Sequence, residues 1–425
     1  MNNSTFPLEK KLSSLVKHYH AGHYNDAEKL AISIIKNYPN NQLGWKVLGA
    51  ILKKTGRVKE ALTPARKSVL LDPDDVEAHK NLGKILMALG MLKEAEKSFE
   101  QAVTLRPSDA ELHNSIGNIL RELGKAEQAE ESYGKSISLN PTLINPRYNL
   151  GQLLFQTGRY KKAVEQLILI NHKGSQNYLL QCYYYDNQQD KFSHHLDNLI
   201  SQGYNNALIG SLITRAKFRY GINKKNPFCN DPLNYVLKYD LREHCDFNNI
   251  FIKGAFSILN DENTETRFQD NLINGKQTSG NLFDRQDPAI EKIKKVLHSE
   301  IKKYQALFKD SSEGLINKWP ANYSINGWLI DMKSGGALNA HIHDTGWLTG
   351  SVYINVPPKL NTDSGNLIVR SDDNEDKSDN NQNRKNIDVV TGSLCLFPSS
   401  LLHHTIPFES SENRVVLAFD VTPEP

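Results

Sequence analysis

Two histidines one residue apart, His341 and His343, are the residues of this chain whose type and spacing could do chemistry. Side chains alternate between the two faces of a β-strand, so both imidazoles point the same way if the segment is extended. A strand is expected directly after them, because residues 346–356 are rich in β-branched and aromatic side chains and end before a proline. A third histidine, His403, could join the pair from another strand.

These histidines have two possible roles. Neutral imidazole is a ligand for iron, zinc, copper and nickel, and protein ligands on one face of an ion leave positions open for a substrate. A single histidine is more often a packed or exposed side chain than a ligand. The pair, the third histidine and Arg414 further on together favour a metal site formed by His341, His343 and His403.

Size and composition set the bounds. A chain of 425 residues is too long for one ordinary core, so two or three domains are expected. Its 39% hydrophobic and 23% charged residues are those of a soluble globular protein. A net charge of +3 gives no electrostatic case for a nucleic-acid or membrane partner. Four dispersed cysteines, no apolar signal segment and no run long enough to span a bilayer favour a cytoplasmic location.

The first half of the chain repeats with a period of 34 residues. Small residues in the helices let paired helices approach closely, a second glycine column marks the turn, and the proline column ends the second helix of each pair. The four columns are Gly49, Gly83, Gly117 and Gly151; Gly22, Gly56, Gly90, Gly124 and Gly158; Ala27, Ala61, Ala95, Ala129 and Ala163; and Pro39, Pro73, Pro107 and Pro141.

This pattern resembles the tetratricopeptide repeat family over about residues 7 to 176, as five repeats. The first repeat is degenerate, with Leu15 in the glycine column, and the fifth lacks its proline. The resemblance implies a solenoid of helix pairs whose concave face holds a protein or an extended peptide. A role as a dimerisation or spacer element is the alternative. We expect the solenoid at 1–176, followed by a helical connector at 177–225.

From residue 226 to 425 the pattern changes. An amphipathic helix is expected at 288–308, and the segment 371–385 has no hydrophobic residue, which predicts a loop. Short strand-like runs separated by turn signals favour a β-sandwich or jelly-roll. The predicted strands are 323–331, 346–356, 365–369, 387–390, 393–397 and 414–421. The fold class is therefore multidomain α + β, with an N-terminal α-solenoid and a C-terminal double-stranded β-helix.

The order of short motifs in this second half resembles the 2-oxoglutarate and Fe(II)-dependent oxygenases, in particular a bacterial and phage branch. Each motif is weak alone, and their order is the specific signal. The motifs are His341-Ile342-His343, Gly350-Ser351-Val352-Tyr353, Gly365-Asn366-Leu367, Gly392-Ser393-Leu394, Phe397-Pro398-Ser399, His403-His404-Thr405-Ile406-Pro407 and Arg414 to Asp420. The resemblance implies Fe(II) held by histidines of the first and last motifs, with 2-oxoglutarate and dioxygen as cosubstrates. Arg414 would take the distal carboxylate of 2-oxoglutarate, for which a planar bidentate donor is well suited.

One departure concerns the ligand set. The wider superfamily has histidine-x-carboxylate, whereas position 343 is histidine and Asp344 lies one residue further on. On a regular strand Asp344 faces away, which favours His341, His343 and His403. A bulge could instead turn Asp344 inward in place of His343. The family spacing favours His403 over His404 as the third ligand.

Four aromatic residues are candidates for the pocket wall. They are Trp328, Trp347, Tyr323 and Tyr353. Trp347 is better explained as part of the hydrophobic core, whereas Tyr323 and Tyr353 are equally well explained as core residues or as cofactor-binding residues. No catalytic side chain is expected beyond the metal centre.

The function that these patterns favour is that of a 2-oxoglutarate- and Fe(II)-dependent hydroxylase whose repeats recruit a protein or peptide substrate. The alternatives are a non-catalytic interaction protein with a metal- or ligand-sensing barrel, and a cupin-like metal enzyme that uses no 2-oxoglutarate.

Overall fold

The computed structural model describes residues 5–424 except 171, 263, 268, 270 and 375–381. The chain forms two compact units, Met1–Asp186 and Asn187–Pro425. The division falls within the segment 177–225 that the sequence suggests as a connector.

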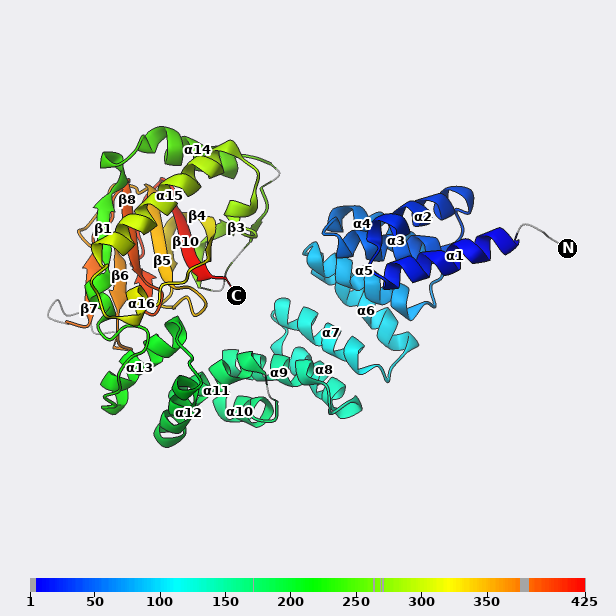
Figure 1. Cartoon of the computed structure of the whole chain (residues 1–425), viewed down its shortest axis with the longest axis horizontal. Helices are drawn as coiled ribbons and strands as arrows, with labels where there is room; N and C mark the ends of the chain where they lie inside the picture. The colour runs from blue at the N-terminus through cyan, green and yellow to red at the C-terminus, as the bar shows by residue number, and fades with distance from the viewer. Residues whose placement is uncertain are drawn as a thin grey trace. The chain divides into compact units, whose positions relative to one another are not determined.

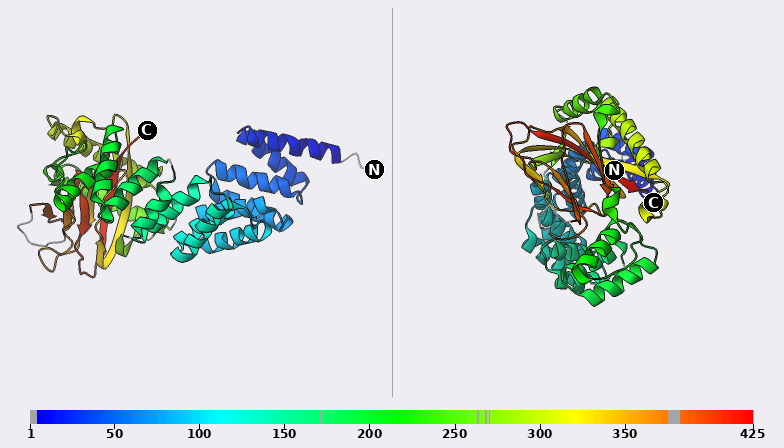
Figure 2. Two further views of the ribbon diagram at one scale, coloured as in Figure 1. Left: turned by 90° about the horizontal axis from the view of Figure 1, so that it is seen from below. Right: turned by 90° about the vertical axis from the view of Figure 1, so that its left-hand side faces the viewer.

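The first unit is a run of antiparallel helix pairs, which succeed one another in chain order from blue to green (Figure 2). Five pairs are followed by one further helix. Their bounds are α1 Thr5–His20, α2 Tyr24–Asn37, α3 Gln42–Lys54, α4 Val58–Leu71, α5 Val76–Ala88, α6 Leu92–Leu105, α7 Ala110–Glu122, α8 Ala126–Leu139, α9 Ile144–Gln156, α10 Tyr160–Leu167 and α11 Lys173–Tyr185.

The glycine columns explain how each pair packs. A Cβ on Gly83 would lie 2.4 Å from the ring of Phe99, and a Cβ on Gly117 would lie 2.5 Å from the ring of Tyr133. Each glycine therefore opens the space that the aromatic ring of the partner helix fills. The turn column adopts φ values that favour glycine, such as +82° at Gly56. The proline column follows the second helix of the first four pairs, and the predicted solenoid is confirmed.

The second unit joins helices to two antiparallel sheets. Its helices are α12 Gln189–Ser201, α13 Ala207–Tyr220, α14 Lys253–Leu259, α15 Pro288–Leu307 and α16 Gly314–Asn317, with short 3-10 or π segments η1 Pro232–Tyr235, η2 Leu241–Glu243, η3 Asn248–Ile252 and η4 Leu282–Asp284. Its strands are β1 Leu237–Asp240, β2 Thr266–Arg267, β3 Leu272–Thr278, β4 Tyr323–Leu338, β5 Leu348–Asn355, β6 Leu367–Arg370, β7 Arg384–Ile387, β8 Ser393–Pro398, β9 Leu402–Thr405 and β10 Arg414–Pro423. No helix among the described residues has the length and apolar character needed to cross a membrane.

The large sheet has the order β1-β8-β5-β10-β4-β3-β2, and the small one has the order β7-β6-β9. Helices α14 and α15 cover the outer face of the large sheet (Figure 1), and one apolar core lies between them. A second core fills the space between the two sheets. This arrangement is the predicted jelly-roll sandwich.

Alternation along β4 and β10 divides side chains between these two cores. On β4, Ile325 and Leu329 face the helices, whereas Ile330 and Met332 face the small sheet. The inner face of the sandwich is therefore lined by even-numbered positions of both strands.

Most predicted strands are present with ends shifted by a few residues. The exception is the strand predicted at 387–390, because β7 is Arg384–Ile387 and Val389 is buried in the coil that follows. Of the predicted loop 371–385, residues 375–381 lie outside the described part of the chain. The strands β1, β2, β3 and β9 had no clear sequence signal, since all but β3 have two to four residues.

Candidate metal centre and anion pocket

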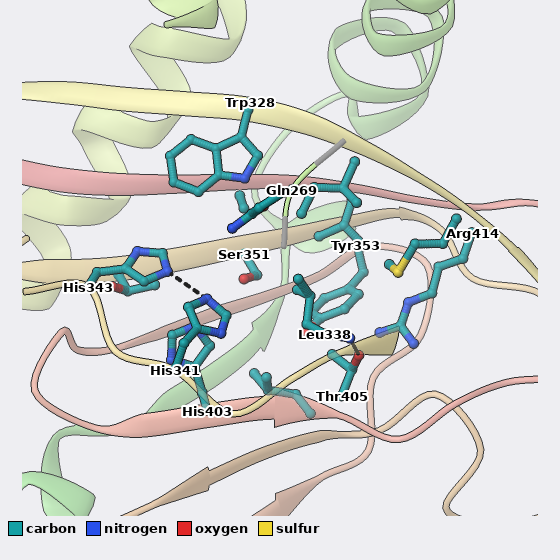
Figure 3. A pocket seen from close by; sticks show the side chains of 16 residues that line it. Gln269, Trp328, Leu338, His341, His343, Ser351, Tyr353, His403, Thr405 and Arg414 are labelled. Atoms are coloured by element: carbon teal, nitrogen blue, oxygen red, sulfur yellow. Dashed lines mark hydrogen bonds between the residues drawn. The ribbon is translucent and has the colours of Figure 1, made fainter. Parts of the chain in front are cut away.

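Three imidazoles converge inside the sandwich. One ring nitrogen from each of His341, His343 and His403 lies within 4.8 Å of one from each of the others. The ring centroids of His341 and His403 are 4.3 Å apart, and those of His343 and His403 are 4.9 Å apart. Figure 3 shows the three rings grouped at one end of the pocket.

The backbone holds the histidines in a way that differs from the predicted strand. Strand β4 ends at Leu338, and His341 forms an isolated bridge with His403 on β9. The amide N–H of each donates to the carbonyl of the other, at 3.1 and 3.0 Å. His343 lies in coil, and its N–H donates to the carbonyl of Ser399 at 3.3 Å. The segment leaves the large sheet to pair with the small one, so regular strand ends before it.

Hydrogen bonds set the same tautomer on all three rings. Nδ1 of His341 lies 2.7 Å from the carbonyl of Asn339, and Nδ1 of His403 lies 3.2 Å from that of Leu401. Nδ1 of His343 lies 2.6 Å from both carboxylate oxygens of Asp420. Since a carbonyl or carboxylate only accepts, each Nδ1 carries a proton and each Nε2 presents its lone pair.

Burial favours the neutral form of two of these rings. It lowers the pKa of His341 to about 4, with a further contribution from His343, and it lowers the pKa of His403 well below the usual range. Burial acts in the same direction on His343, but the Asp420 carboxylate outweighs it and raises that pKa. At neutral pH His341 and His403 are thus ready to bind a cation.

The spacing of the nitrogens fits a shared cation. Nε2 of His341 and Nε2 of His343 are 3.1 Å apart, a contact that is a hydrogen bond when one of the two atoms carries a proton. Two nitrogens about 2.1 Å from one ion and at a right angle to each other lie about 3.0 Å apart. A divalent ion would replace this contact by two metal–nitrogen bonds, so the three histidines fit a metal such as Fe(II).

Arg414 lies at the opposite end of the same pocket (Figure 3). Its side chain is 1% exposed, and Nη1 donates to the carbonyl of Gly365 at 2.5 Å. Nε and Nη2 are buried with no acceptor among the described residues. Burial lowers the pKa of Arg414, and the guanidinium lies against the rings of Tyr353 and Phe408, at 5.1 and 5.9 Å. Two unused donors on a buried cation fit a carboxylate ligand.

The pocket between these two ends has a cavity volume of about 30 Å³ and is partly open to solvent. Its walls come from both sheets and from the segment before β3, and they are mainly apolar. They comprise Gln269, Trp328, Ile330, Met332, Leu338, Thr349, Ser351, Tyr353, Leu367, Thr405, Val416 and Ala418, together with the three histidines and Arg414. This is the usual form of a small-molecule site.

The structure places the other sequence candidates as follows. Tyr353 and Trp328 line the pocket. Tyr323 does not, because it lies at an odd position of β4 and its hydroxyl is 3.4 Å from Nδ1 of His298 on α15. Trp347 is core, with Nε1 donating to the carbonyl of Leu315 at 2.8 Å.

The two histidine alternatives also separate. Asp344 is exposed in a turn and lies outside the cluster of possible ligands. His404 follows His403 on β9 and points away, since His403 and Thr405 are the residues of that strand that line the pocket.

Sequence reasoning assigned no role to Asp420. Arg414, Val416 and Ala418 line the pocket from alternate positions of β10, and Asp420 continues the alternation behind His343. The period of two along a predicted strand could have identified it.

Comparison with known families agrees with this geometry. Residues 326–420 match the family described as “Putative 2OG-Fe(II) oxygenase”. Residues 117–158 match a family described as “TPR repeat”, and residues 76–109 match “Tetratricopeptide repeat”. The chain thus joins segments that match tetratricopeptide repeats to a segment that matches a family of putative 2OG-Fe(II) oxygenases.

Solved structures that resemble the chain include repeat proteins. A structure described as the functional characterisation of Pseudomonas aeruginosa pilF has 18% identity and a TM-score of 0.40, over 45% of this chain and 90% of that one. MamA residues 41–end from Desulfovibrio magneticus RS-1 has 19% identity and a TM-score of 0.36, over 43% and 97%. YrrB, described as a TPR protein with an unusual peptide-binding site, has 20% identity and a TM-score of 0.36, over 40% and 91%. No curated protein matches the chain.

Proposed function

We propose that this protein is a 2-oxoglutarate- and Fe(II)-dependent oxygenase. The observation that carries the proposal is one pocket with three convergent imidazoles at one end and a buried guanidinium with two unused donors at the other. His341, His343 and His403 would hold the metal through Nε2. Arg414 would bind the distal carboxylate of 2-oxoglutarate.

When bound, the metal and 2-oxoglutarate supply oxidising power: dioxygen and 2-oxoglutarate are converted to succinate and carbon dioxide while a substrate C–H bond is hydroxylated. The chain's own residues bind, orient and exclude water. Apolar side chains such as Leu367 and Val416 would keep water from the cosubstrate. Trp328, whose ring centroid is 5.8 Å from that of His343, would form the wall next to the metal.

The proposal is tested by metal content and by coupled product formation. Protein reconstituted anaerobically with Fe(II) should hold about one ion per chain and release succinate only when 2-oxoglutarate and dioxygen are present. His403→Ala should lose the ion, whereas the matched neighbour variant His404→Ala should keep it. Equal iron content in the two variants would refute the ligand set.

We further propose that the repeats recruit a protein or peptide substrate through an acidic segment. Lys53 on α3 and Lys84 on α5 are half-buried, and they have no carboxylate partner among the described residues. Burial lowers the pKa of both; Lys84 lowers the pKa of Lys53 further, and Lys80 lowers the pKa of Lys84 further. By contrast, Lys46 pairs with Asp75 at 2.5 Å. Unpaired, partly desolvated cations on adjacent helices favour an anionic partner.

Fluorescence anisotropy with labelled peptides of matched length tests this recruitment. An acidic peptide should bind more tightly than a basic one, with an affinity that falls as salt rises. Lys53→Glu with Lys84→Glu should abolish this preference, and Lys93→Glu with Lys97→Glu, on the exposed side of α6, should retain it. Equal binding by both pairs of variants would refute the proposed face.

A further inference from the structure

Asp420 occupies a special position behind the metal site. Both of its carboxylate oxygens lie 2.6 Å from Nδ1 of His343, and both side chains are 11% exposed. The other two histidines use neutral carbonyls at the same ring position. His343 is therefore the only one of the three rings that shares its Nδ1 proton with an anion.

The surrounding structure holds this carboxylate in place. Asp420 lies on β10, which pairs with β5 on one side and β4 on the other, and Thr349 is its partner residue on β5. The Thr349 hydroxyl is 2.8 Å from Oδ1 of Asp420 and 2.8 Å from the hydroxyl of Ser399, and all three residues are buried. A Cβ on Gly346 would lie 2.7 Å from the Ser399 hydroxyl and 3.3 Å from Oδ1 of Asp420, so a glycine at this position leaves the space that the group occupies.

The net charge of the metal site explains why a carboxylate behind His343 would matter. A divalent ion held by two histidines and a carboxylate has a net charge of about +1 with its ligands, whereas three neutral imidazoles leave about +2 in a buried site. Uncompensated charge is costly away from water. Asp344 cannot compensate from the exposed turn, whereas Asp420 places a negative charge one hydrogen bond from Nδ1 of His343, on the other side of the ring that would bind the ion.

We propose that Asp420 is a positioning residue that replaces, through His343, the carboxylate ligand that this site lacks. It keeps the proton of His343 on Nδ1, aims Nε2 at the ion and makes this ring the strongest donor of the three. The inference rests on the proposed metal site. Residues that orient a ligand in this way typically contribute 10–100-fold to metal affinity.

Anaerobic titration with Co(II), followed by its visible absorption, measures this role without any turnover. Asp420→Asn should weaken Co(II) binding by about 10–100-fold and shift the absorption band. Asp344→Asn, the exposed control, should bind as the wild type does. In a His343→Ala background, Asp420→Asn should cost less than about threefold, because the residue acts through that ring.

Thermal midpoints of the metal-free proteins show whether each variant is folded. If Asp420→Asn does not fold, Thr349→Val tests the same contact, since it removes the hydroxyl that orients the carboxylate; it should also weaken Co(II) binding. A folded Asp420→Asn with wild-type affinity and spectrum would overturn the proposal, as would an undiminished effect in the His343→Ala background. Failure of the wild type to bind Co(II) would instead overturn the proposed metal site itself.

Discussion

Replacing Arg414 by methionine should have opposite effects on ligand binding and on stability. The guanidinium makes one hydrogen bond to the protein, and its two remaining nitrogens have no acceptor among the described residues. Methionine keeps the apolar contact with Tyr353 and Phe408 and removes a buried charge. The metal-free protein should therefore unfold at the same temperature as the wild type or higher.

The expected loss in 2-oxoglutarate binding follows from the two free donors. A hydrogen bond to a charged group contributes about 1.5–3 kcal/mol, so two of them contribute about 3–6 kcal/mol. At about 1.4 kcal/mol per factor of ten, the dissociation constant should rise by roughly 10²–10⁴-fold.

Arg215 provides the matched control. It is 4% exposed, but it is paired with Asp373 at 2.6 Å. Arg215→Met should leave 2-oxoglutarate binding unchanged and destabilise the protein by about 1–3 kcal/mol, because Asp373 is only partly shielded from solvent.

Isothermal titration of the Mn(II)-loaded protein under anaerobic conditions measures the affinity, and thermal unfolding measures the stability. Arg414→Met that binds 2-oxoglutarate within about threefold of the wild type would refute the reasoning. A fall in the thermal midpoint of Arg414→Met as large as that of Arg215→Met would also refute it, because the Arg414 guanidinium would then stabilise the folded protein.

Other predictions concern the repeats and the metal. Gly117→Ala should destabilise the protein by about 1–3 kcal/mol in urea unfolding, because the new Cβ meets the Tyr133 ring, whereas Gly134→Ala on α8, with no atom within 4 Å, should stabilise it by about 0.5–1 kcal/mol. A chelator should lower the thermal midpoint of the metal-loaded protein, and added Fe(II) should restore it. Burial alone would raise the pKa of Asp75, but hydrogen bonds from Lys46 and the cap of α5 outweigh it and lower the pKa. This carboxylate therefore stabilises the fold above about pH 4 and loses that effect as pH falls through its folded pKa, so Asp75→Asn should reduce the loss of stability between pH 6 and pH 3.

Much of the solenoid could be predicted because its information is local. Each repeat contacts its neighbours only, so the same residue types recur wherever the same contact recurs. The glycine opposite Tyr133 and the glycines in the turns are visible as columns in the sequence. The strands that carry Tyr353 and Arg414 could be predicted for the same reason, since β-branched residues and period-two alternation mark a half-buried strand.

The short strands and the local path of the histidine segment could not be predicted. Strand β9 has four residues and exists because it pairs with β6. The sequence predicted that His341 and His343 converge because both would lie on one face of a regular strand. In the structure they converge although His341 forms only an isolated bridge and His343 lies in coil. Tyr323 does not line the pocket, because its side chain lies on the face of β4 that packs against α15. Which face that helix covers could not be predicted from the sequence.

The sequence by itself determined the residue chemistry: imidazoles, a guanidinium and the repeat period are present whatever the fold. Tertiary structure alone decided which of these groups face one another. It left two nitrogens of Arg414 without an acceptor among the described residues, turned Asp344 to solvent and put Asp420 behind His343. These outcomes depend on the pairing of strands far apart in the chain, and long-range pairing is set by how whole faces pack rather than by any short stretch of sequence.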